Sequence, residues 1–137
     1  VGFPGETDEE FAISEAFIRD MNFAGLHVFR YSIRSGTPAS RMRNQVPTKV
    51  KKQRSATLLA LSDQIEANFA HSLKNTSQSV LWEQITGSTP DSFVNTGYTD
   101  NYMRVKAIHP RDLTNHITST QLGDYVDGAI LGNPVIE

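Results

Sequence analysis

Residues 93–108 read FVNTGYTDNYMRVKAI, and this stretch decides the fold of the second half of the chain. Apolar and polar residues alternate before and after a short Asp–Asn segment at positions 100–101. Alternation with a period of two indicates half-buried β-strands, and an Asp–Asn cluster between two such runs indicates a turn. The stretch therefore predicts a β-hairpin with strands at 93–99 and 101–108.

Similar segments surround this hairpin. SVLWEQI (79–85), HITSTQL (116–122) and YVDGAIL (125–131) are short and rich in β-formers, and turn signals such as GSTPDS (87–92) separate them. About five short strands at regular spacing are typical of a small closed sheet. We predict a small all-β antiparallel barrel, similar to an OB fold, over residues 76–137.

Residues 1–75 have a different pattern, in which strands alternate with helices. TDEE (7–10) reads as a capping box at a helix start, LHVFRYS (26–32) as a buried strand, and residues 47–74 as one long helix. This order is typical of an α/β fold. Two strands cannot form a stable parallel sheet, because both faces and both edges need cover. We therefore predict that residues 1–45 are the last third of a larger α/β domain.

Composition excludes several kinds of site. The chain has no cysteine, which rules out disulfides, thiolate nucleophiles and cysteine metal sites among its residues and favours a reducing compartment, the cytoplasm. The four histidines lack ligand spacing, so we predict no metal site. No apolar run is long enough for a membrane span.

Positive charge is concentrated in one block. No acidic residue lies between Asp20 and Asp63, and that window holds eight basic residues: Arg30, Arg34, Arg41, Arg43, Lys49, Lys51, Lys52 and Arg54. Residues 76–137 hold three basic residues against seven acidic ones. A basic block of this density favours an anionic partner, although a solvated helix face would give the same pattern.

Two loops are candidate ligand contacts. GFPGE (2–6) joins a predicted strand to a predicted helix, the end of an α/β fold at which ligands bind. YSIRSGTPASRM (31–42) follows the next predicted strand and should lie on the same rim. Its Arg34 could bind a phosphate or a carboxylate through two hydrogen bonds. A tight turn with no ligand remains the alternative for GFPGE.

The hairpin carries a third candidate site. Tyr98 and Tyr102 lie near Arg104 and Lys106, and aromatic rings beside cations suit single-stranded nucleic acid. We expect one tyrosine to pack inward and the other to face outward. The acidic balance of this region argues against strong binding by the barrel alone, because phosphate neutralisation supplies much of the affinity.

In this order, VGFPGETDEEF, LHVFRYSIRSGTPASRM, VPTKVKKQRSATLLAL and GYTDNYMRV resemble the C-terminal part of the radical S-adenosylmethionine methylthiotransferases. The resemblance covers nearly the whole chain. LHVF before YS resembles the branch that acts on threonylcarbamoyl-adenosine in tRNA, with the isopentenyl-adenosine branch as the alternative.

The resemblance implies an architecture and a chemistry. Residues 1–75 would be the end of a TIM-like radical SAM barrel with a long connecting helix, and residues 76–137 an RNA-binding TRAM barrel. The full-length enzyme would use S-adenosylmethionine and two 4Fe–4S clusters to methylthiolate a modified adenosine next to the anticodon of tRNA. This chain lacks the cluster cysteines, so it would bind neither cluster and would be inactive alone.

The resemblance also assigns residues to roles, and the charge pattern adds to them. Gly2, Phe3, Pro4, Gly5 and Glu6 match the rim of the S-adenosylmethionine site. The expected RNA and substrate contacts are Tyr31, Ser32, Arg34, Gly36, Thr37, Arg41, Arg43, Lys51, Lys52, Tyr98, Asn101, Tyr102, Arg104 and Lys106.

Other interpretations stay open at this point. The chain could be a free-standing RNA-binding module, or a structural domain with no RNA role. An incomplete α/β part would leave strand edges and apolar faces uncovered, which favours a homo-oligomer through residues 1–45.

Overall fold

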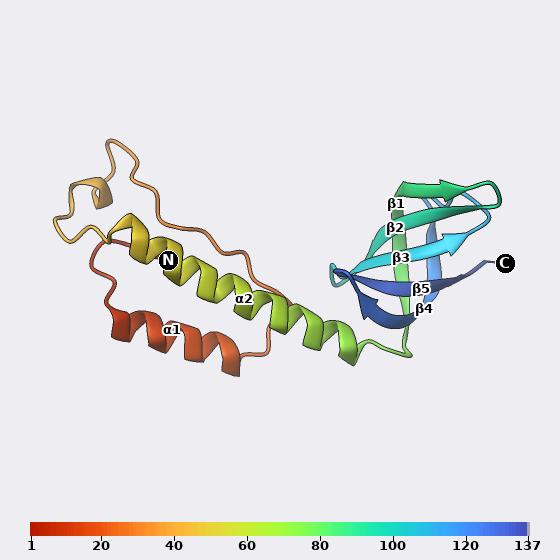
Figure 1. Ribbon diagram of the computed structural model, residues 1–137, viewed down its shortest axis with the longest axis horizontal. Coiled ribbons are helices and arrows are strands. Elements are labelled where there is room, and N and C mark those ends of the chain that lie inside the picture. Colours follow the sequence, from red (N-terminus) through yellow and green to blue (C-terminus); the bar gives the residue numbers. More distant parts are fainter. Residues whose placement is uncertain (137) are drawn as a thin grey trace. The chain divides into compact units, whose positions relative to one another are not determined.

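The computed structural model describes residues 1–136, and the chain divides into two compact units after Glu66 (Figure 1). In chain order the elements are α1 (Asp8–Asp20), the 3-10 helix η1 (Ala39–Arg41), α2 (Thr48–Ser72), β1 (Ser77–Thr89), β2 (Ser92–Thr99), β3 (Arg104–His109), β4 (Ile117–Val126) and β5 (Ala129–Val135). The division falls inside α2.

Helix α1 begins where the sequence predicts. The Thr7 side chain accepts a hydrogen bond from the Glu10 N–H at 3.1 Å, and the Glu10 carboxylate accepts one from the Thr7 N–H at 2.8 Å. This reciprocal pair satisfies two N–H groups that lack partners inside the helix. The predicted capping box is confirmed.

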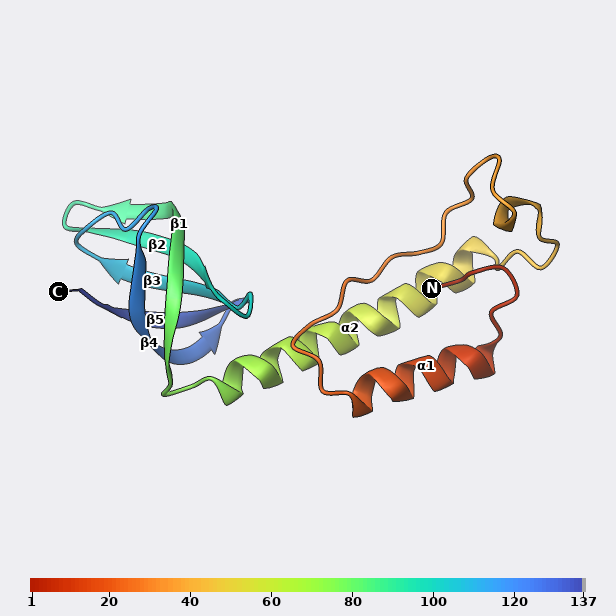
Figure 2. The same ribbon diagram turned by 180° about the vertical axis from the view of Figure 1, so that it is seen from behind.

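The core of the first unit lies between α1, the first part of α2 and the extended chain that precedes α2 (Figures 1 and 2). Leu58, Leu61 and Ile65 are buried on one stripe of α2, as their spacing predicts. Partly buried side chains from the other segments pack against this stripe: Val1, Phe11, Ile18, Leu26 and Val28.

The strand predicted at residues 26–32 is wrong in one respect: the segment is extended, but it forms no sheet. Within residues 1–136 its only bonds to another backbone segment join the chain start, where the Val1 nitrogen donates to Phe29 O at 2.7 Å and Tyr31 N–H donates to Val1 O at 2.8 Å. These two bonds are the ones that a single residue, here Val1, makes with a parallel neighbouring strand. A β-strand needs a partner of several residues, and residues 1–66 contain no such partner.

A buried arginine on α2 holds the loop before α1. Arg54 is 5% exposed and donates to Glu6 O at 3.1 Å and to Asp8 Oδ1 at 2.7 Å, and it pairs with Glu6 Oε1 at 3.1 Å. The other Glu6 carboxylate oxygen accepts the N–H groups of Gly2 and Phe3. One guanidinium thus fixes a carboxylate that in turn fixes the turn at residues 2–6.

Lys51 is also internal, which corrects its prediction as an RNA contact on the surface. It is 8% exposed, its ammonium donates to Tyr31 O at 3.2 Å, and it lies 5.2 Å from the centre of the Tyr31 ring. Gly2 makes room for it, because a Cβ at Gly2 would lie 2.3 Å from Lys51 Cγ. The lysine stem fills the space that a side chain at position 2 would need.

The second unit is a closed five-stranded barrel with the strand order β1-β2-β3-β5-β4. Neighbouring strands are antiparallel except β3 and β5, which pair in parallel at Val105–Ile130 and Lys106–Leu131. The predicted small β-barrel is confirmed. The one parallel pair was not predicted, because it joins strands that are not consecutive in the chain.

Alternate residues of the strands fill the barrel. Val80, Trp82, Val105, Leu122 and Ile130 are all buried in one cluster, against which Phe69 and Leu73 of the helical segment pack. Trp82 is fully buried, and its Nε1–H donates to Thr118 Oγ1 at 2.9 Å. A buried indole needs such a partner.

We expect Gly97→Ala to destabilise the barrel by about 3 kcal/mol or more, because a Cβ at Gly97 would lie 2.1 Å from the Leu81 carbonyl oxygen of β1. Urea unfolding followed by the fluorescence of Trp82, the single tryptophan, measures the change. Gly87→Ala is the matched control, because its Cβ would meet only the Val94 side chain at 3.3 Å. Equal stabilities of the two variants would contradict the close approach of β1 and β2.

We expect Arg54→Met to lower the local stability of the turn at residues 2–6 by about 2 kcal/mol, because the Glu6 and Asp8 carboxylates lose their charged donor. Hydrogen exchange of the Gly5 and Glu6 amides, which bond to Asn44 O and Phe3 O, reports on this turn. Lys52→Met removes an exposed charge from the same helix and should leave both amides protected.

Candidate nucleic-acid interface on the barrel

Tyr102 has an unusual backbone for an aromatic residue. Its φ is +66°, a left-handed conformation that costs about 1 kcal/mol for a residue with a Cβ. Thr99 imposes it: Tyr102 N–H donates to Thr99 O at 3.0 Å, and Met103 N–H donates to Thr99 Oγ1 at 2.9 Å. The Tyr102 side chain is 86% exposed, so burial does not offset this strain. Strain held in place at an exposed aromatic residue indicates a function for it.

A groove lies beside Tyr102 on the outer face of the barrel. The rings of Tyr98 and Tyr102 are 6.3 Å apart between centres and inclined by 48°. The strand register places Tyr98 opposite Leu81, and Leu81 opposite Ile117, so these three form a row across β2, β1 and β4. Together with Ser79, Glu83, Thr99 and Asp100 they line a hollow of about 500 Å³.

Two cations follow this row on β3. Arg104 lies opposite Tyr98, and Lys106 lies opposite Thr96. Val105 lies between them and Ala107 follows Lys106, and both are buried, so Arg104 and Lys106 belong to the outer face. Neither cation forms an ion pair within residues 1–136, and Arg104 Nε is buried there without a hydrogen-bond partner.

The arrangement can hold an unpaired nucleotide. Aromatic rings stack on bases, and a neighbouring arginine or lysine neutralises the phosphates. Glu83 and Asp100 repel phosphates on their side of the groove, so a bound strand would turn its backbone toward Arg104 and Lys106.

The hairpin prediction needs one correction. Tyr98 and Tyr102 were expected to divide between the core and the surface, but neither is part of the barrel core. Asn101, another predicted contact, accepts a hydrogen bond from Thr99 Oγ1 at 2.5 Å and thereby shapes the turn. The sequence analysis missed Leu81 and Ile117, whose apolar side chains at outward positions were the available signal.

In the first unit the two predicted loops meet. The rings of Phe3 and Tyr31 touch edge to face with centres 5.4 Å apart. Gly2 and Gly5 have φ values of +75° and +91°, which only glycine adopts without strain. The turn and the first part of α1 line an open hollow of about 590 Å³, with Phe3, Pro4, Gly5, Glu6, Glu10, Ile13 and Ser14 around it.

The rest of the second loop is mostly exposed. Thr37 Oγ1 donates to Arg34 O at 2.8 Å, which closes the turn around Gly36. The remaining predicted contacts, Ser32, Arg34, Arg41, Arg43 and Lys52, are exposed, and none of these cations forms an ion pair within residues 1–136.

Residues 1–136 contain no group of three His, Cys, Asp or Glu side chains that could hold a metal ion. No helix among them has the length and apolar character needed to cross a membrane.

Comparisons with known proteins point to one kind of enzyme, although no family model matches the chain. Threonylcarbamoyladenosine tRNA methylthiotransferase MtaB of Bacillus subtilis is 42% identical over 122 residues, 89% of this chain and 27% of the relative. The tRNA-2-methylthio-N(6)-dimethylallyladenosine synthase of the same organism is 32% identical over 139 residues, 98% of this chain and 27% of the relative.

Sequence identity alone does not decide between relatives named for threonylcarbamoyladenosine and relatives named for dimethylallyladenosine. A dimethylallyladenosine synthase from Endomicrobium trichonymphae is also 42% identical, over 85 residues, 62% of this chain and 20% of the relative. The chain spans about a quarter of the length of the curated relatives that it matches. It therefore belongs to the tRNA methylthiotransferase family, as a segment that corresponds to part of these longer proteins.

Proposed function

We propose that this chain is an RNA-contacting part of a tRNA methylthiotransferase, and that the groove beside Tyr102 stacks an unpaired base of the tRNA. The strained and exposed Tyr102 is the observation that carries the proposal. The relatives act, by their names, on modified adenosines of tRNA, which agrees with a site for unpaired nucleotides.

The cations divide the work of binding in this proposal. Arg104 and Lys106 bind the phosphates of the nucleotide that stacks on the tyrosines. Arg34, Arg41, Arg43 and Lys52, which are exposed in the first unit, add contacts to the tRNA backbone. Lys51 has no such part, because its ammonium is bonded to Tyr31 O.

The turn at residues 2–6 is proposed as one wall of the S-adenosylmethionine site. The turn adjoins the open hollow before α1, and this hollow can accept part of a cofactor. In the full-length enzyme the iron–sulfur clusters supply the radical and sulfur chemistry. Their cysteine ligands must come from outside these residues, because the chain contains no cysteine.

We propose threonylcarbamoyladenosine as the modified nucleoside. LHVF before YS and the 42% identity to the Bacillus subtilis MtaB over 89% of the chain support this branch. Mass spectrometry of tRNA nucleosides from cells that gain the full-length enzyme would test it. Methylthiolated dimethylallyladenosine as the only new product would overturn this branch assignment and leave RNA binding intact.

We expect Tyr102→Gly to raise stability and lower tRNA affinity. Removing the Cβ relieves the left-handed strain and adds about 1 kcal/mol of stability, whereas losing one stacked base costs about 1–3 kcal/mol of binding. Urea unfolding and tRNA binding at fixed salt measure the two effects. Tyr102→Phe keeps the ring and should retain binding.

Asn75→Gly is the matched control for this substitution. Asn75 also has a φ of +66° and is exposed, but it does not line the groove. It should gain stability without any change in tRNA affinity. Undiminished tRNA binding by Tyr102→Gly would reject the groove as the RNA site.

A further inference from the structure

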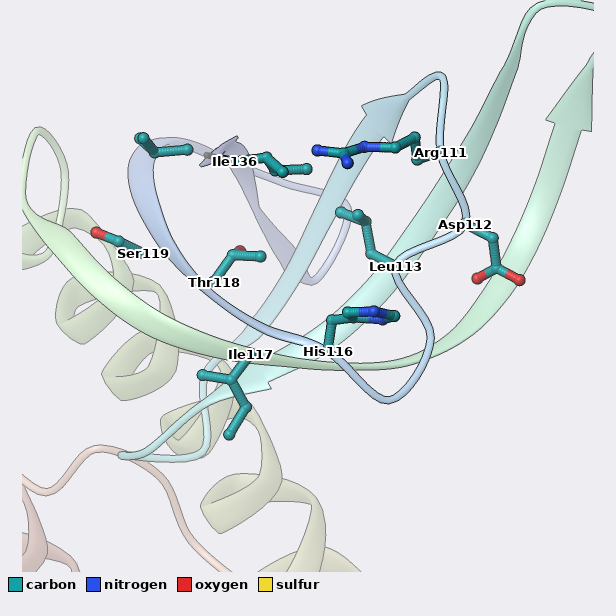
Figure 3. Close-up of a pocket in the computed structure, with 9 residues that line it drawn as sticks. Arg111, Asp112, Leu113, His116, Ile117, Thr118, Ser119 and Ile136 are labelled. Atoms are coloured by element: carbon teal, nitrogen blue, oxygen red, sulfur yellow. The ribbon is translucent and has the colours of Figure 1, made fainter.

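A second hollow of about 430 Å³ opens on the barrel next to the loop between β3 and β4 (Figure 3). Figure 3 shows Arg111 extending toward Ile136, with Leu113 below it and His116 below Leu113. Thr118 lies on one side of Leu113, and Asp112, which also lines the hollow, lies on the other side. A cation and an imidazole thus flank an apolar surface.

The loop that carries these side chains is held rigidly by the barrel. The buried Asn95 side chain donates to Arg111 O at 3.2 Å and accepts the Leu113 N–H at 2.9 Å. The backbone N–H of Trp82 donates to His116 O at 3.0 Å. Both ends of the loop are therefore fixed to inward-facing strand positions, so a ligand would meet a preorganised surface.

Arg111 is a cation without an internal partner. Within residues 1–136 its guanidinium makes no hydrogen bond and no ion pair. The nearby Asp112 carboxylate instead accepts the Thr114 N–H at 2.8 Å, and hydrogen bonds from Thr114 lower the pKa of Asp112. This carboxylate is engaged with Thr114 and not with Arg111, which leaves the guanidinium for an external anion.

His116 presents one defined nitrogen. Its Nδ1 lies 3.0 Å from Thr114 O, and a carbonyl can only accept, so Nδ1 carries the proton. In the neutral ring Nε2 is then an acceptor, and it has no partner within residues 1–136. A ligand hydroxyl is the complementary donor.

The two hollows on the barrel are neighbours. Ile117 lines both the groove beside Tyr102 and the hollow beside Arg111. A nucleotide that follows or precedes a base stacked in the groove therefore comes within reach of this second surface.

We propose that the hollow holds one ribonucleotide of an RNA strand, with Arg111 on its phosphate and His116 Nε2 accepting a hydrogen bond from its ribose 2′-hydroxyl. The apolar side chains of Leu113 and Ile136 cover the face of the sugar. The inference rests on the proposed RNA-binding function, and it adds a contact that tells RNA from DNA.

The test compares binding of a single-stranded RNA and a single-stranded DNA of identical sequence to the 137-residue chain across a salt titration. Arg111→Gln should reduce the salt slope by about 0.7 for both strands, because one phosphate contact is lost. His116→Phe should weaken RNA binding about fivefold and leave DNA binding unchanged, because one hydrogen bond is lost. Trp82 fluorescence confirms that each variant is folded.

Arg19→Gln is the control for the loss of one positive charge, because Arg19 is paired with Glu15 and lines neither barrel hollow. An unchanged salt slope in Arg111→Gln, or equal losses for RNA and DNA in His116→Phe, would overturn the inference. If Tyr102→Gly still weakens binding in that case, the proposed function stands. If the unaltered chain binds neither RNA nor tRNA, both proposals fail.

Discussion

Closure of the sheet through β1 is the constraint on which the barrel depends. β1 is the longest strand, and it pairs with β2 along one edge and with β4 along the other. Its register against β2 shifts between Trp82 and Gln84 and again between Ile85 and Gly87. Such irregularities bend a strand and increase its twist, which lets one strand belong to both sides of a small barrel. Gly97 allows the close approach of β2 to the bent strand.

The same strand links the core to the proposed binding surface. Alternation along β1 buries Val80 and Trp82 and turns Leu81 outward, between Tyr98 and Ile117. Trp82 also fixes the loop that presents His116, through the backbone bond to His116 O. Because one strand sets both the groove and the second hollow, the two surfaces share the rigidity of the core. Binding then requires little ordering of the protein, which favours affinity in a barrel with few cations.

Sequence analysis succeeded where the information is local. The capping box at Thr7 and the helix from Thr48 follow from neighbouring residues, and the structure confirms them. The strand predicted at 125–131 is wrong, because a turn at Asp127 and Gly128 divides it between β4 and β5, and the strand predicted at 101–108 begins only at Arg104. Sequence analysis also failed where a partner distant in sequence decides the outcome. Residues 26–32 are extended but form no sheet. Lys51 is buried because its stem fills the space beside Gly2, where a side chain would otherwise lie. The groove combines residues 81, 98 and 117; the sequence shows apolar side chains at outward positions 81 and 117, but only strand pairing brings them beside residue 98.

The burial of Lys51 and Arg54 changes the meaning of the basic block. These two cations act as internal donors to Tyr31 O and to the Glu6 and Asp8 carboxylates, so they contribute to folding rather than to an external field. Only the exposed members of the block can release counterions when RNA binds.

The barrel carries three basic residues against seven acidic ones over residues 76–137, so its attraction for a polyanion is weak. Stacking on Tyr102 depends little on salt, whereas contacts by Arg34, Arg41 and Arg43 depend on it strongly. In the proposed function the two units therefore take complementary parts: the exposed cations of the first attract the phosphate backbone, and the groove of the second selects unpaired bases.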